Sequence, residues 1–470
     1  MRERVRLVAL CVFAGGVGGL LATQVFTVVA GVVAGVAALY ALVKLDSWQR
    51  LYVIAIVLLF CATSSFPILV GAAYYARYAA VAVLAFWTWS QHQDEARPLR
   101  ESSPAIGWLV KGLWLAVLVS FLSVLWSIDR ETTILQAIAL AALATIVHGL
   151  VTRRWRTGER IAGDLSTAAL ALSALFAVGI GASALGLVDP STAGTGATPR
   201  FRVLYDNPNS LGISCALVFP ILWGLWRHSR RRVYLLAMLP TAASLIMCQS
   251  RTSLVAVGIA FAVVVARNSA GRTKVVVGAV VFSVAFYAVS ILGLVGSAPF
   301  ATNLAERFTT NGGNGLLTDR MVAWGAAFDQ WQANPVGGVG YSAGPALFAS
   351  LRDAGRLVFS PDVVHNSYLQ WLLELGILGL LPLLVLMRAC GAVAFHGRLN
   401  RLGSGLVPAV VAGLLIQLTE SAMFGTGQAY PFLFWLVVTG ALINSGVSTS
   451  VLEADTYSGK CAQKQSRIDA

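Results

Sequence analysis

His365 is the first candidate for a catalytic residue. It lies at the end of a polar loop and at the start of the largely apolar segment His365–Gly376. An imidazole with an ordinary pKa near 6.5 accepts a proton at neutral pH, so His365 is a candidate general base for a hydroxyl nucleophile. A single histidine can equally be structural. Glu374 would point away from His365 on a helix that starts there. We expect Glu374, like Glu420, to make a buried polar contact between helices.

A second polar motif, Pro199–Asn209, contains Arg200 and Arg202 and precedes an apolar segment. Pro208 suits the first turn of a helix, and asparagine can cap the unpaired amide hydrogens there. Capping alone would explain the motif. A helix N-terminus beside two guanidinium groups also attracts phosphate, so we predict that Arg200, Arg202 and Asn209 contact an anionic ligand.

Arg251 belongs to the polar motif Gln249–Ser253, which separates two apolar segments. An arginine costs about 2.5–3.5 kcal/mol at the membrane centre and less at the interface. Arg251 is therefore either an anion ligand or a side chain that reaches out to water. Arg320 and Trp324 are four residues apart, on one face of a predicted short amphipathic helix. We expect Arg320 to bind substrate, and we interpret Asn334–Gly340 as a turn.

These residues are embedded in a very apolar chain of 470 residues, with 57% hydrophobic and 12% charged side chains. Soluble globular proteins have about 25% charged residues, so this composition excludes that class. We predict an all-α polytopic integral membrane protein with about 12–14 transmembrane helices and one larger periplasmic loop that contains short helices. The predicted apolar segments are 5–22, 25–43, 51–66, 70–90, 106–126, 133–151, 162–187, 209–226, 233–249, 252–267, 275–296, 367–388, 404–421 and 430–446.

Residues 1–446 are predicted to form a single transmembrane domain, with the large loop at 297–366 and a cytoplasmic, disordered tail at 447–470. With both termini in the cytoplasm, most of the 34 Lys and Arg residues fall on the cytoplasmic side, as the positive-inside rule requires. The candidate residues then face the outer side of the membrane. Arg77 is one of the few arginines that this topology places on the non-cytoplasmic side, and we expect it in an ordinary solvated loop.

Sequence motifs for cofactors are missing. The six cysteines are scattered, and there is no Walker A, H-E-x-x-H or D-x-D motif. We therefore predict no metal, no cofactor and no nucleotide. The net charge of +13 is distributed in short clusters between apolar segments, which follows membrane topology and does not indicate a nucleic-acid partner.

Over residues 115–445, the order of these motifs resembles the superfamily of O-antigen ligases and O-antigen polymerases, which are bacterial envelope glycosyltransferases. The resemblance rests on the motifs in chain order: Arg200 before Asn207-Pro208-Asn209, Ser250-Arg251, Arg320 with Trp324, Asn334-Pro335 with Gly338-Val339-Gly340, and His365-Asn366 with Glu374 and Gly376.

The resemblance implies an inverting, metal-independent transfer of a glycan from undecaprenyl diphosphate at the periplasmic face of the inner membrane, in lipopolysaccharide assembly. It further implies that Arg200 and Arg251 hold the diphosphate and that His365 deprotonates the acceptor. For a ligase, which we prefer, the acceptor is lipid A-core. The alternative is a polymerase that extends the lipid-linked glycan. A transporter of lipid-linked sugars should show repeated halves and mid-membrane ionisable residues, which this sequence does not show.

Overall fold

The computed structural model describes residues 45–65, 67–90, 103–155, 157–186, 200–268, 318–355, 363–425 and 427–446. Its helices are α3 Ser47–Cys61, α4 Pro67–Ser90, α5 Pro104–Ser123, α6 Arg130–Gly149, α7 Gly158–Ala184, α8 Pro208–Ser229, α9 Arg232–Met247, α10 Arg251–Asn268, α13 Thr318–Ala333, α14 Gly344–Asp353, α15 Ser367–Leu375, α16 Leu380–His396, α17 Gly403–Ile416 and α18 Ala429–Gly446. A short π-helix follows α6, and a 3-10 turn, Gly376–Gly379, joins α15 to α16.

This part of the chain is an all-α polytopic membrane protein, as predicted. Six of its helical stretches are long and apolar enough to cross a membrane. They are Leu69–Ser90, Pro104–Ser123, Arg130–Arg154, Gly158–Ala184, Pro208–Ser229 and Ser367–His396. Four shorter apolar helices accompany them. Each predicted apolar segment within the described ranges corresponds to one helix, except 367–388, which contains α15, the 3-10 turn and the first half of α16. The predicted segments 5–22, 25–43 and 275–296, and the tail 447–470, lie outside the described residues.

The bundle core is built around α8, α17 and α18. Most of α18 is buried, and α8 packs on α17 through glycines: a Cβ on Gly224 would come within 2.6 Å of the Leu402 carbonyl oxygen. Small residues allow helices in a membrane to approach closely, which increases their van der Waals contact. This tight packing fixes the start of α8 relative to the residues that follow α17.

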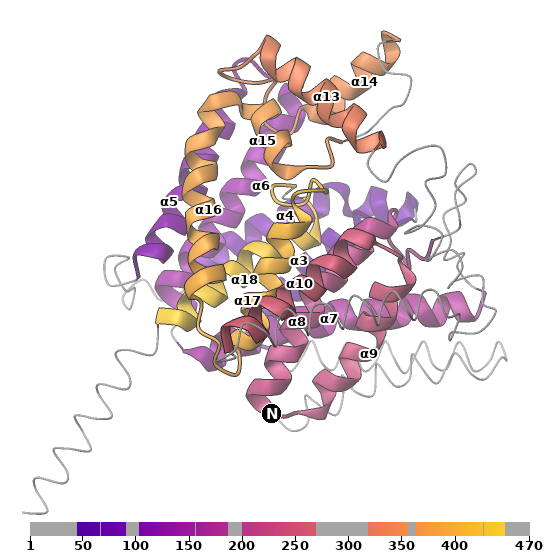
Figure 1. Ribbon diagram of the computed structural model, residues 1–470, viewed down its shortest axis with the longest axis vertical. Helices are drawn as coiled ribbons and strands as arrows, with labels where there is room; N and C mark the ends of the chain where they lie inside the picture. The colour runs from indigo at the N-terminus through magenta and orange to yellow at the C-terminus, as the bar shows by residue number, and fades with distance from the viewer. Residues whose placement is uncertain are drawn as a thin grey trace, which may run out of the picture.

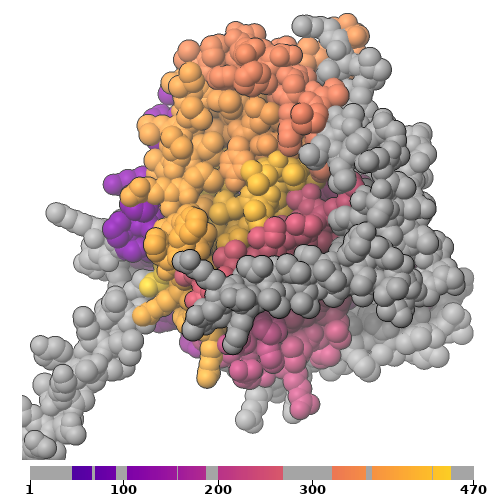
Figure 2. Space-filling model, viewed as in Figure 1, coloured from indigo at the N-terminus to yellow at the C-terminus, as the bar shows by residue number. Residues whose placement is uncertain are grey.

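Helices α13, α14 and α15 lie together at one end of the molecule, where α13 and α14 cover α15 (Figure 1). Together α13 and α14 form the exposed cap drawn in orange in Figure 2. Both belong to the predicted loop 297–366, so the expected short helices are present there. Buried Phe348 and Leu373 belong to a small apolar cluster that packs this cap onto α15.

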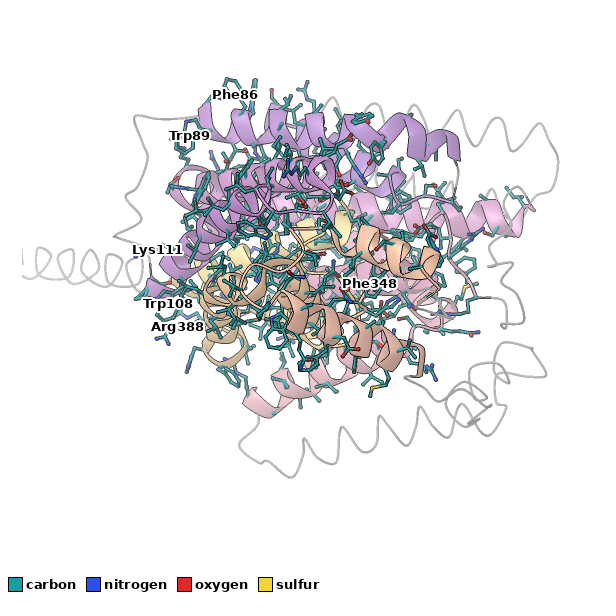
Figure 3. The ribbon with its side chains drawn as sticks, turned by 90° about the horizontal axis from the view of Figure 1, so that it is seen from above. Phe86, Trp89, Trp108, Lys111, Phe348 and Arg388 are labelled. Atoms are coloured by element: carbon teal, nitrogen blue, oxygen red, sulfur yellow. The ribbon has the colours of Figure 1, made fainter. Side chains whose placement is uncertain are left out.

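Where the first turns of α5 meet the middle of α16, the guanidinium carbon of Arg388 lies 3.9 Å from the centre of the Trp108 ring. Figure 3 shows both side chains beside Lys111, apart from Phe348 of α14. Arginine stacked on tryptophan is typical of a membrane interface. The assignment of the start of α5 to the cytoplasm stays a prediction.

Candidate functional site

Glu420 is the centre of the polar network that joins the predicted site residues. It lies between α17 and α18 and is only 5% exposed. Its Oε1 atom forms an ion pair with Arg320 and accepts a hydrogen bond from Asn209 Nδ2 at 3.0 Å. Its Oε2 atom lies 3.3 Å from His365 Nδ1. One carboxylate therefore connects three chain segments that are far apart in the sequence.

The interpretation of Glu420 as a buried polar contact between helices was incomplete. The carboxylate is buried, but it follows α17 in a non-helical segment and contacts the candidate base directly. One feature of the sequence could have indicated that Glu420 contacts other polar residues of the site. An acidic side chain at the end of an apolar segment needs a partner that compensates its charge, although nothing local identified the partner.

Arg200 is attached to this network through Asn209. Arg200 Nη2 donates to Asn209 Oδ1 at 2.8 Å, and Arg200 Nε donates to the Cys248 carbonyl at 3.2 Å. Asn209 is positioned by the start of α8, where the side chain of Asn207 accepts a hydrogen bond from the Asn209 backbone at 2.8 Å. The predicted helix entry is confirmed, and it also orients a member of the network.

Arg251 is brought to the same place by the turn between α9 and α10. It is the first residue of α10 and half-buried, three residues after the Cys248 carbonyl that binds Arg200. The next residue, Thr252, accepts a hydrogen bond from Thr419 at 3.0 Å, which holds the start of α10 against the segment that carries Glu420. Arg251 also stands at the positive end of a helix dipole. The structure thus gathers Arg200 and Arg251 at one end of α8 and α10.

Arg202 is placed differently from Arg200. Its Nη1 atom donates to the Asp206 backbone carbonyl at 3.4 Å, a local contact within the loop. None of the contacts described for Arg202 reaches Glu420 or Asn209. Arg200 is the member of this pair that the fold connects to the candidate base.

His365 is held in place by a ladder of hydrogen bonds between residues 365–367 and 417–423. Asn366 Nδ2 donates to the Leu418 carbonyl at 3.1 Å, and the Ser367 backbone donates to the Gln417 carbonyl at 3.0 Å. The Asn366 side chain also caps α15. His365 itself has a φ of 55°, a left-handed conformation that is uncommon for residues other than glycine. Such backbone strain persists only where the surroundings enforce it, and it is enriched at functional sites.

The network defines the chemistry available to His365. A carboxylate only accepts hydrogen bonds, so an ionised Glu420 selects the tautomer with the proton on Nδ1. The Nε2 lone pair then becomes the proton acceptor, as in other sites where a carboxylate orients a histidine. The Arg320 guanidinium compensates the charge of Glu420.

No group of three His, Cys, Asp or Glu side chains in the described part of the chain could hold a metal ion. The positive charges of this site are arginines. Guanidinium groups bind phosphate oxygens through paired, charge-assisted hydrogen bonds. The arrangement therefore combines a candidate proton acceptor with guanidinium groups, a type of group that binds phosphate in other proteins.

A comparison with protein families gives one match. The family model described as O-antigen ligase matches residues 234–384, about a third of the chain. The matched region includes Arg251, Arg320 and His365, whereas Arg200 and Glu420 lie outside it. A search of curated proteins finds no match to this chain. Together with the order of motifs and the helical membrane fold, the family match supports the placement of this chain in the superfamily of O-antigen ligases and O-antigen polymerases.

Proposed function

We propose that this protein is an O-antigen ligase, which transfers a glycan from undecaprenyl diphosphate to a hydroxyl group of lipid A-core at the periplasmic face of the inner membrane. The observation that carries the proposal is the Glu420 network. It connects a histidine with an oriented tautomer to Arg320 and, through Asn209, to Arg200. The family match supports the class of reaction.

In the proposed reaction, Nε2 of His365 takes the proton of the acceptor hydroxyl as its oxygen attacks the anomeric carbon of the donor. The new glycosidic C–O bond forms while the bond from the anomeric carbon to the diphosphate oxygen breaks. The electron pair of that bond leaves with undecaprenyl diphosphate. Attack from the side opposite the leaving group inverts the anomeric centre.

Arg200 and Arg251 stabilise the charge that develops on the departing diphosphate. Arg200 is held by the Cys248 carbonyl and Asn209, and Arg251 is the first residue of α10. Groups that are already positioned need little reorganisation during the reaction, which is the property that makes electrostatic stabilisation effective. Arg320 has a different role in this scheme, since it is paired with Glu420. It holds the carboxylate that orients His365 and closes the site from α13.

The test is a reaction of the purified protein in detergent with lipid-linked O-antigen and lipid A-core. EDTA is present and nucleotide is omitted, because we expect neither a metal nor a nucleotide to be required. We expect glycosylated lipid A-core from the wild type and none from His365→Ala. If lipid A-core stays unmodified while the lipid-linked glycan lengthens, the protein is a polymerase. Activity that EDTA abolishes and added metal restores would contradict the metal-independent scheme.

A further inference from the structure

A cavity of about 270 Å³ lies next to the Glu420 network and is not used by the scheme above. It is lined by residues of α4, α6, α14 and α15 and of the segment that follows Glu420. Its wall includes Ser367 and Ser421, the second of which directly follows Glu420 in the chain. Ligand pockets are usually roughly 300–1,000 Å³, so this one fits a single small unit.

Three residues that line this cavity carry a buried polar atom without a hydrogen-bond partner among the described residues: Arg77 Nε, Gln370 Oε1 and Ser421 Oγ. The prediction that Arg77 lies in a solvated loop is wrong. Arg77 is only 8% exposed, and its Nη1 atom donates to the Gly427 carbonyl at 2.9 Å. Buried polar groups are nearly always paired in folded proteins, and the side chains that carry these three atoms all line one cavity. These polar side chains suit an occupant with hydroxyl groups, which would pair with the three atoms after a small side-chain rotation.

The rest of the wall indicates the class of this occupant. Aromatic side chains are part of the lining, and among them the rings of Trp371 and Phe424 lie with their centres 3.8 Å apart and their planes tilted by 35°. The charges are mixed, because the Arg77 cation shares the cavity with Glu374 and Asp129. Glu374 is engaged by Gln370 Nε2 at 2.8 Å and by the Ser342 backbone at 2.8 Å. Such a lining matches an uncharged sugar ring, with C–H groups to pack on aromatic faces and hydroxyls for polar atoms.

We infer that this cavity binds one sugar unit of the acceptor oligosaccharide and so presents the neighbouring hydroxyl to His365. The inference rests on the proposed function. The assignment to the acceptor follows from the positions of the arginines and of the cavity relative to His365. Arg200 and Arg251, which would hold the leaving group, come from the beginnings of α8 and α10, whereas the cavity is built by other helices. An inverting displacement requires the acceptor and the leaving group on opposite sides of the anomeric carbon.

The inference is tested by binding, separately from transfer. The probe is the deacylated oligosaccharide of lipid A-core, titrated calorimetrically into the purified full-length protein. Ala346 lines the cavity from the first turn of α14 and is half-buried, so Ala346→Trp should fill the cavity. Ala349 lies on the same helix outside the lining, and Ala349→Trp is the matched control. We expect at least a tenfold higher Kd for Ala346→Trp and an unchanged Kd for Ala349→Trp.

Ser421→Ala provides a second test that adds no bulk. Its hydroxyl has no hydrogen-bond partner among the residues that the structure describes, so its removal should leave the fold intact. Loss of one hydrogen bond to the acceptor should raise the acceptor KM about tenfold, with the donor KM and kcat unchanged. A purely structural role for Ser421 would not separate the two KM values.

Wild-type protein that does not bind the oligosaccharide would overturn the inference, and so would a folded Ala346→Trp variant with the wild-type Kd and KM. Active wild type with unaffected cavity variants would refute the subsite while leaving the ligase proposal in place. Binding that Ala346→Trp abolishes, in a protein that transfers no glycan, would support the subsite and contradict the ligase.

Discussion

At the residue scale, the charge of Glu420 is expected to be essential. Glu420→Gln keeps the size of the side chain and an oxygen that can accept a hydrogen bond, but it removes the carboxylate that selects the Nδ1–H tautomer of His365 and pairs with Arg320. We expect transfer to fall roughly 10²- to 10⁴-fold, the usual contribution of an oriented general base. The measurement is kcat in the reconstituted reaction, with thermal unfolding as the check on folding.

The matched control is Asp353→Asn, which removes a carboxylate whose side chain is 78% exposed on α14. It should leave the rate within about twofold of wild type, because exposed ion pairs contribute little. A Glu420→Gln variant that is as active as Asp353→Asn would show that Glu420 has only a structural role.

Arg200 and Arg202 form a natural pair for comparison, since two positions separate them. Arg200→Ala removes the guanidinium that is joined to Asn209 and to the Cys248 carbonyl, whereas Arg202→Ala removes a local contact to the Asp206 backbone. Loss of one group that stabilises the transition state typically costs about 10²–10³ in rate. We expect a loss of that size for Arg200→Ala and a much smaller one for Arg202→Ala. Equal losses in kcat/KM would refute our choice of Arg200.

At the element scale, the break between α15 and α16 depends on Gly376. Its φ is 56°, and an added Cβ would lie 2.4 Å from the Val336 carbonyl oxygen. The loop 334–340 is hydrogen-bonded to this break, with the Ile377 backbone donating to the Pro335 carbonyl at 2.9 Å. The predicted turn at Asn334–Gly340 therefore packs on α15, the helix that begins two residues after His365.

Gly376→Ala should destabilise the protein by at least about 1–3 kcal/mol, because it combines an unfavourable φ with a steric clash. The measurement is the Tm of the purified protein in detergent, with transfer activity recorded in parallel. Gly391→Ala is the control, since Gly391 lies inside α16 with no atom within 4 Å of the added Cβ. A Tm for Gly376→Ala that equals the Gly391→Ala value would contradict this account.

At the scale of the whole molecule, the orientation in the membrane can be tested by introducing one exposed cysteine at a time beside the native ones. Asp353 on α14 and Glu159 on α7 are both well exposed, with side chains that are 78% and 75% accessible. The positive-inside rule puts Asp353 in the periplasm and Glu159 in the cytoplasm. A membrane-impermeant maleimide should label Asp353→Cys in intact spheroplasts and Glu159→Cys only after permeabilisation. The unsubstituted protein is the control, and the reverse pattern would invert the topology.

The sequence by itself determined the local features of this protein. Long apolar runs with charges at their ends form helices at any position in the chain, because the backbone N–H and C=O groups of a segment in lipid must be hydrogen-bonded to each other. The cap at Asn207 and the turn at Asn334–Gly340 also depend on neighbouring residues alone. The order of the motifs was sufficient for the family resemblance.

The tertiary structure alone decided how these features meet. Asn209, Arg320 and His365 are 211, 100 and 55 residues from Glu420 in the chain, and only the packing of α8, α13 and α17 brings them to one carboxylate. The same holds for Arg77, whose Gly427 partner is 350 residues away. Helical periodicity predicts which face of each segment is apolar, but it contains no information on which distant segment covers that face. The segment that packs on this face also supplies the partners of a buried charge, so these partners are known only from the tertiary structure.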